Sequence, residues 1–564
     1  MATKYVIIGG SAAGPKTASK IRRMDPEGEI TMIQKGKFLS MASCGYPYFV
    51  GGVFDDPNML IATPTGAQRD PSFFMNVKNI KALTSTEATA INREKKTVVL
   101  KNLETGKNSE IPYDKLFLAT GANAIMPPLP GKDLEGVKTV QSMEDAIYLK
   151  DRLKNDDIKK AIIVGGGLIG IETCEALELG GVDITVVEMQ DQILGFLDWE
   201  MAKHVETHLK AKGGKVITGV GVTEFVGKDG KITGAKLSDG RTLECDLAVV
   251  SIGVKPNSKL ASEAGLATGQ IGGIAVNTFM QTSDPSIFAG GDCVEVTNLV
   301  THNKAHWPMG DAANLQGRVA AQNMVLGNCV EYEGMIGTGI CKVFDYTAGS
   351  TGLSEKQAAK LGYTNIMTAI QAAPDKPGFM GASPIIIKLV ADKTTCRLLG
   401  MQAVGTGDVS KRIAIGAMAI HGKMRVYDLV NLDLPYAPPF SPAIDNFITA
   451  AHVLQNKCLG RMEGISSLEV KAQLDAGDKP FLLDVRGADE FEQMRIGIGE
   501  KLIPLGALRK KAEELPEDKT AEIIVYCKIS LRGYEAYCTL KGMGYTNVKV
   551  MEGGVIAWPF GREK

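Results

Sequence analysis

Cys44 is the first residue of this chain whose surroundings suggest chemistry. It lies in the segment SMASCGYPYF, residues 40–49, and no second cysteine is near it in the sequence. Pro47 favours the first turn of a helix, where its missing N–H has no intrahelical partner to lose. The free N–H groups and positive dipole end of such a helix favour a thiolate at Cys44. The segment alone is equally compatible with a buried structural cysteine.

A glycine-rich turn, GGSAAG at residues 9–14, follows a strand predicted over 4–8 and precedes a helix predicted over 15–24. Such a turn brings backbone N–H groups and a helix dipole to a pyrophosphate. Ser11 replaces the middle glycine of the usual pattern, and Gln34 replaces the acid that normally binds a ribose. Both side chains can still hydrogen-bond a dinucleotide. The predicted contacts are Gly9, Ser11, Gly14 and Gln34.

A second copy of the pattern, GGGLIG at residues 165–170, has all three glycines. The strand after its helix ends at Glu188, 23 residues past the first glycine. A carboxylate at this place binds both ribose hydroxyls and repels a 2′-phosphate, and no arginine follows it. We therefore expect NADH rather than NADPH. The predicted contacts are Gly165, Gly167, Gly170 and Glu188.

Two dinucleotide sites in one chain imply two dinucleotides, most simply a flavin and a nicotinamide that exchange a hydride. Two further segments support a flavin. A predicted strand ends at Thr120 and Gly121, and another ends in the sequence GGD, whose carboxylate is Asp292.

This ordered set of motifs, together with Gly253, resembles the pyridine nucleotide–disulfide oxidoreductases over roughly residues 1–450. The resemblance implies a homodimer in which NADH reduces FAD, and FAD reduces a cysteine beside the isoalloxazine ring. Cys44 falls where the family places that cysteine. By the same resemblance, Asp292 hydrogen-bonds the FAD ribitol.

The chain departs from the dithiol members of the family, because the residue five positions after Cys44 is Phe49. Oxidised Cys44 is then a sulfenic acid, or a mixed disulfide or persulfide with a small sulfur compound. Similar NADH peroxidases carry a histidine in the first glycine turn, and this chain has none there. Ser40 and the sequence CGYPY resemble coenzyme A-disulfide reductases.

Four more residues match that group of reductases. Arg22 and Arg23 could meet the 3′-phosphate-ADP of coenzyme A, although a solvated helix end explains them almost as well. Tyr346 and Tyr436 match tyrosines that reach from the partner subunit and can donate a proton to a leaving thiolate. Aromatic packing is the alternative explanation for both tyrosines.

The last hundred residues begin a new α/β pattern after residue 464, including a helix predicted over 504–514. The sequences LDVR and GGVIAW in this region resemble rhodanese domains. The loop CKISLR, residues 527–532, follows a buried strand and can form an anion-binding nest. Its donors, with the charges of Lys528 and Arg532, would hold a thiolate or persulfide at Cys527. An inactive rhodanese fold kept for docking is the alternative.

The fold class expected from these motifs is α/β, with two Rossmann-like domains, an α+β dimerisation domain and a rhodanese-like domain. The predicted boundaries are 1–115 with 248–325 for the FAD-binding domain, 116–247 for the NAD-binding domain, 326–455 for the dimerisation domain, 456–464 for a linker and 465–564 for the rhodanese-like domain.

Composition excludes several other functions. The chain has 63 Lys and Arg against 64 Asp and Glu, so no charge signature for nucleic acid is present. Its ten cysteines form no CxxC motif, which argues against a metal site or a disulfide framework and suits the cytoplasm. No apolar run approaches the roughly eighteen residues that span a membrane.

Together these features predict an FAD-dependent NADH oxidoreductase that reduces persulfide, polysulfide or coenzyme A-disulfide substrates at Cys44. Cys527 would carry sulfane sulfur. The choice among the three substrates, and direct sulfur exchange between the two cysteines, stay open. So do two other functions: an NADH oxidase in which reduced flavin meets oxygen, and a redox-sensing or sulfur-relay protein whose flavin turns over slowly.

Overall fold

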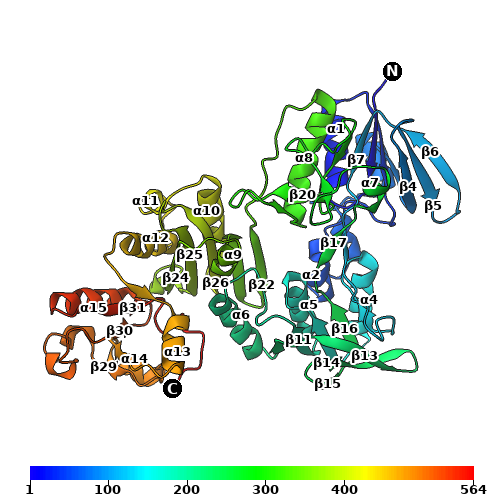
Figure 1. Cartoon of the computed structure of the whole chain (residues 1–564). Coiled ribbons are helices and arrows are strands. Elements are labelled where there is room, and N and C mark those ends of the chain that lie inside the picture. Colours follow the sequence, from blue (N-terminus) through cyan, green and yellow to red (C-terminus); the bar gives the residue numbers. More distant parts are fainter. Residues whose placement is uncertain (156, 564) are drawn as a thin grey trace. The chain divides into compact units, whose positions relative to one another are not determined.

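A computed structural model describes residues 1–155 and 157–563 (Figure 1). The chain divides into two compact units. Unit 1 comprises Met1–Asp191 and Gly213–Met335, and unit 2 comprises Gln192–Lys212 and Ile336–Lys564. In the described part of the chain, no helix is both long enough and apolar enough to cross a bilayer.

The first sheet of unit 1 has five parallel strands in the order β19-β7-β1-β2-β3. Its strands are β1 (Lys4–Ile8), β2 (Glu29–Ile33), β3 (Lys81–Leu83), β7 (Lys115–Leu118) and β19 (Ile287–Ala289). The apolar run of β1 suits a strand covered on both faces, and Val6, Ile7 and Ile8 are buried. Helices α1 (Ala13–Met24) and α8 (Gly310–Leu326) pack against each other beside this sheet (Figure 1).

The second sheet of unit 1 repeats this design in the order β12-β11-β10-β16-β9. Its strands are β9 (Val137–Lys138), β10 (Lys160–Val164), β11 (Asp183–Glu188), β12 (Lys215–Thr218) and β16 (Leu247–Val250). Helix α5 (Leu168–Leu179) follows the second glycine turn, as the sequence predicts, and α4 (Met143–Lys154) precedes β10.

The chain passes between the two sheets through an antiparallel pair, β8 (Ala122–Ala124) and β17 (Val254–Pro256). The last strand before this pair on the way out is β7, in the first sheet, and the last strand before it on the way back is β16, in the second. Sheet membership changes a few residues after the predicted changes at 115/116 and 247/248.

Smaller elements complete unit 1. They are α2 (Tyr46–Val50), α3 (Pro71–Lys78), β4 (Thr86–Asn92), β5 (Thr97–Asn102), β6 (Asn108–Pro112), β13 (Val222–Lys228), β14 (Lys231–Leu237), β15 (Thr242–Glu244), α7 (Lys259–Glu263), β18 (Ile274–Ala275), β20 (Val294–Thr297) and β21 (Lys304–Ala305).

Unit 2 contains an antiparallel sheet in the order β22-β23-β26-β25-β24. Its strands are β22 (Gly339–Val343), β23 (Tyr346–Gly352), β24 (Ile366–Pro374), β25 (Pro384–Asp392) and β26 (Leu398–Gly405). The helices of this part are α6 (Trp199–Ala211), α9 (Glu355–Lys360), α10 (Val409–His421), α11 (Val426–Leu429) and α12 (Asn446–Cys458). Helix α12 thus extends into the predicted linker.

The C-terminal part of unit 2 has a parallel sheet in the order β27-β31-β30-β28-β29. Its elements are β27 (Gly464–Ile465), α13 (Ser467–Asp475), β28 (Phe481–Asp484), α14 (Ala488–Gln493), β29 (Lys501–Leu502), β30 (Ile523–Tyr526), α15 (Leu531–Gly542) and β31 (Val548–Met551). The helix predicted over 504–514 is wrong, because that segment forms only two short 3-10 turns, Leu505–Ala507 and Ala512–Glu514.

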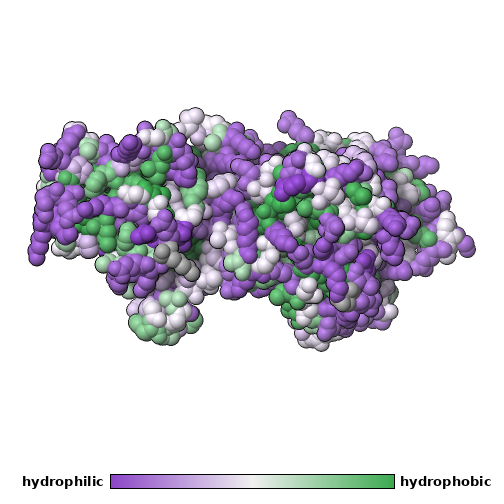
Figure 2. All heavy atoms as spheres, turned by 90° about the horizontal axis from the view of Figure 1, so that it is seen from below, coloured by the Kyte–Doolittle hydropathy of each residue, from purple (hydrophilic) through white to green (hydrophobic). Residues whose placement is uncertain are grey.

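Hydrophilic residues are spread over the face shown in Figure 2, with hydrophobic residues gathered between them. Large exposed apolar side chains occur in the segment after α11, where Tyr436, Phe440 and Ile444 are 59%, 69% and 54% exposed. Such a run of exposed apolar residues commonly marks a surface that another subunit covers.

Candidate functional site

The two glycine turns have the same local geometry. Gly9 and Gly165 have φ angles of +111° and +103°, which glycine adopts without strain. A Cβ atom on Gly14 or Gly170 would collide with the carbonyl oxygen of the first glycine of its own turn. Neither α1 nor α5 has a side-chain cap, so the helix N-termini keep donors for a phosphate.

The residue at the end of the second strand holds each turn in place. The Gly10 N–H donates to Oε1 of Gln34 at 2.9 Å, and the Gly166 N–H donates to Oε2 of Glu188 at 2.7 Å. Gln34 therefore has the same place in the first turn as Glu188 has in the second. These cradles fit two dinucleotides.

Thr120 and Gly121 follow β7 of the first sheet, and Gly253 follows β16 of the second. Gly121 and Gly253 have positive φ angles of +68° and +117°, and the Thr120 hydroxyl donates to the Asn257 carbonyl at 2.6 Å. Burial raises the pKa of Asp292, while the charge of His306 opposes this shift. A buried carboxylate of this kind suits a ligand hydroxyl, because burying it without a hydrogen bond is costly.

His306 lies next to Asp292 in the folded chain. Its Nε2–H donates to the backbone carbonyl of Asp292 at 2.7 Å. It therefore helps to fix the peptide that carries the predicted ribitol-binding carboxylate.

Cys44 lies in a 3-10 turn, Ser43–Gly45, directly before α2. The Ser40 N–H donates to the Gly10 carbonyl at 2.7 Å, so the cysteine loop is tied to the first glycine turn. Cys44 is exposed, whereas Tyr46 and Phe49 on the following helix are buried. The expectation of a cysteine at a helix start is confirmed.

The charge balance around Cys44 corrects the expectation of a favoured thiolate. Partial desolvation, followed by the charges of Glu172 and Asp292, raises the pKa of Cys44. In the chain itself, the thiol is therefore favoured over the thiolate.

Glu172 on α5 is a further residue that sequence reasoning missed. Burial raises its pKa to about 7, although a hydrogen bond from Tyr48 opposes the shift. The Tyr48 hydroxyl donates to Oε1 of Glu172 at 3.3 Å. Because α5 brings Glu172 close to Cys44 only in the folded chain, no sequence spacing indicates it.

The loop around Cys527 lies between β30 and α15. Cys527 is fully buried, at 0% exposed. Arg532 makes a bidentate ion pair with Glu490, with N···O distances of 2.6 and 2.8 Å. This pair raises the pKa of Arg532, with a further contribution from Cys527, and lowers the pKa of Glu490 to about 2. Lys528 is exposed.

Comparison with known proteins identifies the family. The family model described as "Pyridine nucleotide-disulphide oxidoreductase" matches residues 3–310, and its dimerisation domain matches 338–447. A rhodanese-like domain matches residues 466–559. The chain belongs to the pyridine nucleotide–disulfide oxidoreductases.

Similar relatives of this oxidoreductase include an NADH oxidase of Methanocaldococcus jannaschii, which is 35% identical over 78% of this chain and 95% of the relative. An NAD(P)H coenzyme A polysulfide/persulfide reductase of Pyrococcus horikoshii is 31% identical over 81% of this chain and 99% of its own length. The solved NAD-dependent persulfide reductase from A. fulgidus is 42% identical, with a TM-score of 0.93, and covers 99% of this chain and 100% of its own.

Two other predicted residues of this oxidoreductase, Tyr346 and Tyr436, belong to unit 2. Tyr346 is half-buried and stacks on the His208 ring at 4.7 Å, within unit 2. It lines a cavity of about 490 Å³ with Trp558 and Arg562. Tyr436 is exposed. A contact of either tyrosine with a redox sulfur stays a prediction.

The two arginines after α1 differ. The Arg22 guanidinium donates to four backbone carbonyls, those of Asp25, Pro26, Lys78 and Asn79, at 2.6–3.1 Å. Its side chain therefore has a structural role, which leaves the exposed Arg23 as the better candidate for a substrate phosphate.

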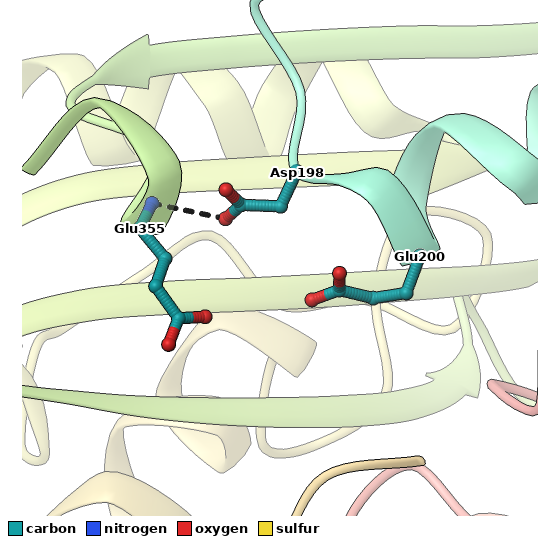
Figure 3. A group of neighbouring side chains, drawn as sticks. All are labelled: Asp198, Glu200 and Glu355. Atoms are coloured by element: carbon teal, nitrogen blue, oxygen red, sulfur yellow. Dashed lines mark hydrogen bonds between the residues drawn. The ribbon is translucent and has the colours of Figure 1, made fainter. Parts of the chain in front are cut away.

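An acidic cluster in unit 2 resembles a cation site. The side chains of Asp198, Glu200 and Glu355 approach one another (Figure 3). However, Nζ of Lys388 lies 2.9, 2.5 and 2.6 Å from their oxygens. Burial alone would lower the pKa of Lys388, but the three carboxylates raise it. The lysine thus occupies the centre of the cluster and balances part of its charge, and these contacts hold α6 and α9 to β25.

Proposed function

We propose that the chain reduces persulfide, polysulfide or coenzyme A-disulfide substrates with electrons from NADH through bound FAD. Cys44 is the attacking sulfur, and Cys527 carries sulfane sulfur. The proposal includes a homodimer and a preference for NADH that rests on Glu188.

The observation that carries the proposal is the exposed, unpaired thiol of Cys44, on a loop that is hydrogen-bonded to the first dinucleotide turn. The next cysteine in the sequence is Cys174, and it is fully buried on α5. Cys44 therefore has no neighbour with which to close a disulfide, and its partner sulfur comes from the substrate. The similar persulfide reductase covers 99% of this chain, including its rhodanese-like domain, whereas the two other relatives cover 78% and 81% of the chain.

In the first step, the Cys44 thiolate attacks the R-bearing sulfur of R–S–SH. The S–S bond breaks, HS⁻ leaves, and Cys44–S–S–R forms. Return of Cys44 to the thiolate takes two electrons and one proton and gives Cys44–S⁻ and RSH; bound FAD, once reduced by NADH, would supply the electrons. Protonation of Glu172 removes one charge that opposes the thiolate.

An anaerobic assay tests the proposal. NADH oxidation is measured with polysulfide, coenzyme A persulfide or coenzyme A disulfide, followed by mass spectrometry of Cys44. We expect turnover well above about 1 s⁻¹ with at least one acceptor, in the range of ordinary enzymes, and a thiol adduct on Cys44. Slow turnover with every sulfur acceptor would contradict it and favour a redox-sensing protein.

NADH oxidase activity is the second candidate, because a relative with 35% identity has that name. Air-saturated buffer without any sulfur compound separates the two functions. An oxidase consumes NADH in it as fast as with polysulfide under argon, whereas a sulfur reductase is at least about tenfold slower.

A further inference from the structure

Serine begins two helices of the C-terminal domain, and the two serines behave differently. The Ser466 hydroxyl accepts a hydrogen bond from the Glu469 N–H at 3.2 Å, which is the usual N-cap of a helix. Ser530 precedes α15 but makes no side-chain cap. Ser530 therefore does not cap its helix, although serine is a residue type that favours capping.

The conformation of Ser530 explains the missing cap. Its φ angle is +89° and its ψ angle −31°, in a region that residues with a Cβ seldom adopt. Ser530 is 7% exposed, and its hydroxyl has no hydrogen-bond partner within the described chain. Strained backbone and an unpaired buried hydroxyl both cost stability, and such costs gather at functional sites.

The backbone around Ser530 also has free donors. Among the described residues, no hydrogen-bond acceptor is found for the N–H groups of residues 528–533, and the first bonded donor is the Tyr534 N–H, which binds the Ser530 carbonyl at 2.9 Å. Behind the loop, the Val555 N–H donates to the Cys527 carbonyl at 3.0 Å. The loop therefore combines a buried cysteine, unpaired N–H groups and one unpaired hydroxyl.

We propose that the Ser530 hydroxyl donates a hydrogen bond to the sulfane sulfur carried by Cys527, and that its non-capping conformation keeps the loop N–H groups free for the same charge. The inference rests on the carrier role of Cys527 proposed above. It makes Ser530 a substrate-binding residue that neither the family matches nor the loop motif assigns.

The chemistry can be written with thiosulfate as the sulfur donor. The Cys527 thiolate attacks the outer sulfur, the S–S bond to the sulfonate breaks, and sulfite leaves with the electron pair. The balance is Cys–S⁻ + S₂O₃²⁻ ⇌ Cys–S–S⁻ + SO₃²⁻. A donor aimed at the terminal sulfur stabilises the right-hand side, since charge accumulates there.

The test measures this equilibrium in the full-length holoprotein. Wild type, Ser530→Gly, Ser530→Ala and Ser467→Ala are incubated with set ratios of thiosulfate to sulfite. The fraction of Cys527 with an added sulfur, about 32 Da, is read by peptide mass spectrometry. Ser467 is a matched control, because its buried hydroxyl also lacks a partner in the described structure.

We expect the equilibrium constant to fall about tenfold to hundredfold in both Ser530 variants, the scale of a lost hydrogen bond to a charged group. Ser467→Ala should stay within twofold of wild type. Glycine suits a positive φ angle, so Ser530→Gly should melt no lower than wild type, which separates binding from folding.

Three results would overturn the inference. If Ser530→Gly loads sulfur as well as wild type, or if Ser467→Ala loses as much as Ser530→Gly, the hydroxyl is not a sulfur ligand. If wild-type Cys527 gains no sulfur, the carrier role itself fails, and the inference fails with it.

Discussion

The surroundings of Cys44 and Cys527 differ in exposure and in charge. Cys44 is exposed on a loop of unit 1, and the nearby carboxylates Glu172 and Asp292 oppose its thiolate. Cys527 is buried, with the Arg532 guanidinium and a row of free N–H groups at its own loop. The surroundings of the first sulfur thus oppose a negative charge, whereas the loop of the second offers donors that could hold one.

Mutation should therefore distinguish the roles of the two cysteines. Cys44→Ser should reduce NADH-dependent reduction of coenzyme A disulfide by at least about 10³-fold, since a nucleophile is lost. Cys527→Ser should leave that rate within about twofold of wild type. Steady-state NADH oxidation under argon measures both. Equal losses in the two variants would mean that the sites work as one.

The Glu490–Arg532 pair should matter for Cys527 alone. Glu490→Gln removes the bidentate partner of Arg532, so sulfur loading of Cys527 should fall about tenfold, while Cys44-dependent turnover is unchanged. Glu492→Gln, an exposed neighbour on α14, is the control. Loading is measured by the mass of the Cys527 peptide.

The same pair gives a dependence of stability on pH. The pKa of Glu490 is about 2 in the folded chain, below its ordinary value of 4.5. Its contribution to stability is therefore present above pH 4.5 and is lost as the pH falls toward 2. Melting curves of wild type and Glu490→Gln should converge in acid and differ at neutral pH; parallel curves would contradict the assignment.

After burial, the charge of Glu172 is the next cause of the raised pKa of Cys44. Removing its charge in Glu172→Gln should lower the pKa of Cys44, so alkylation at a fixed pH near 8 becomes several-fold faster, up to about tenfold for one pKa unit. Iodoacetamide trapping across pH measures the shift. Glu178→Gln on the same helix should not move it, and an unmoved profile in Glu172→Gln would remove Glu172 from the site.

The smallest effect concerns the two serines at helix starts. Ser466→Ala removes a working cap and should lower the free energy of unfolding by about 1 kcal/mol. Ser530→Ala removes no cap and should cost less. Chemical denaturation measures both values, and a larger loss for Ser530→Ala would show that its hydroxyl serves the fold.

Much of the fold follows from local sequence pattern. Strands Lys4–Ile8 and Ile523–Tyr526 have the predicted bounds, because apolar runs beside glycine turns are strong signals. The helix predicted over 504–514 was wrong, because the helix-forming residues of that segment lie in two short 3-10 turns.

Site residues could be predicted only where they belong to a motif with a fixed sequence spacing. Both glycine turns and the two cysteines could be found in this way. Glu172 could not, because its effect on Cys44 arises from the packing of α5 near α2. Nor could Ser530, whose sequence context predicts an ordinary cap and whose φ angle reverses that prediction.

One peptide contact links the loop of Cys44 to the first glycine turn, from the Ser40 N–H to the Gly10 carbonyl. Both partners are backbone atoms, so the contact does not depend on the chemistry of the Ser40 side chain. A replacement at residue 40 could therefore alter substrate recognition and leave this link intact.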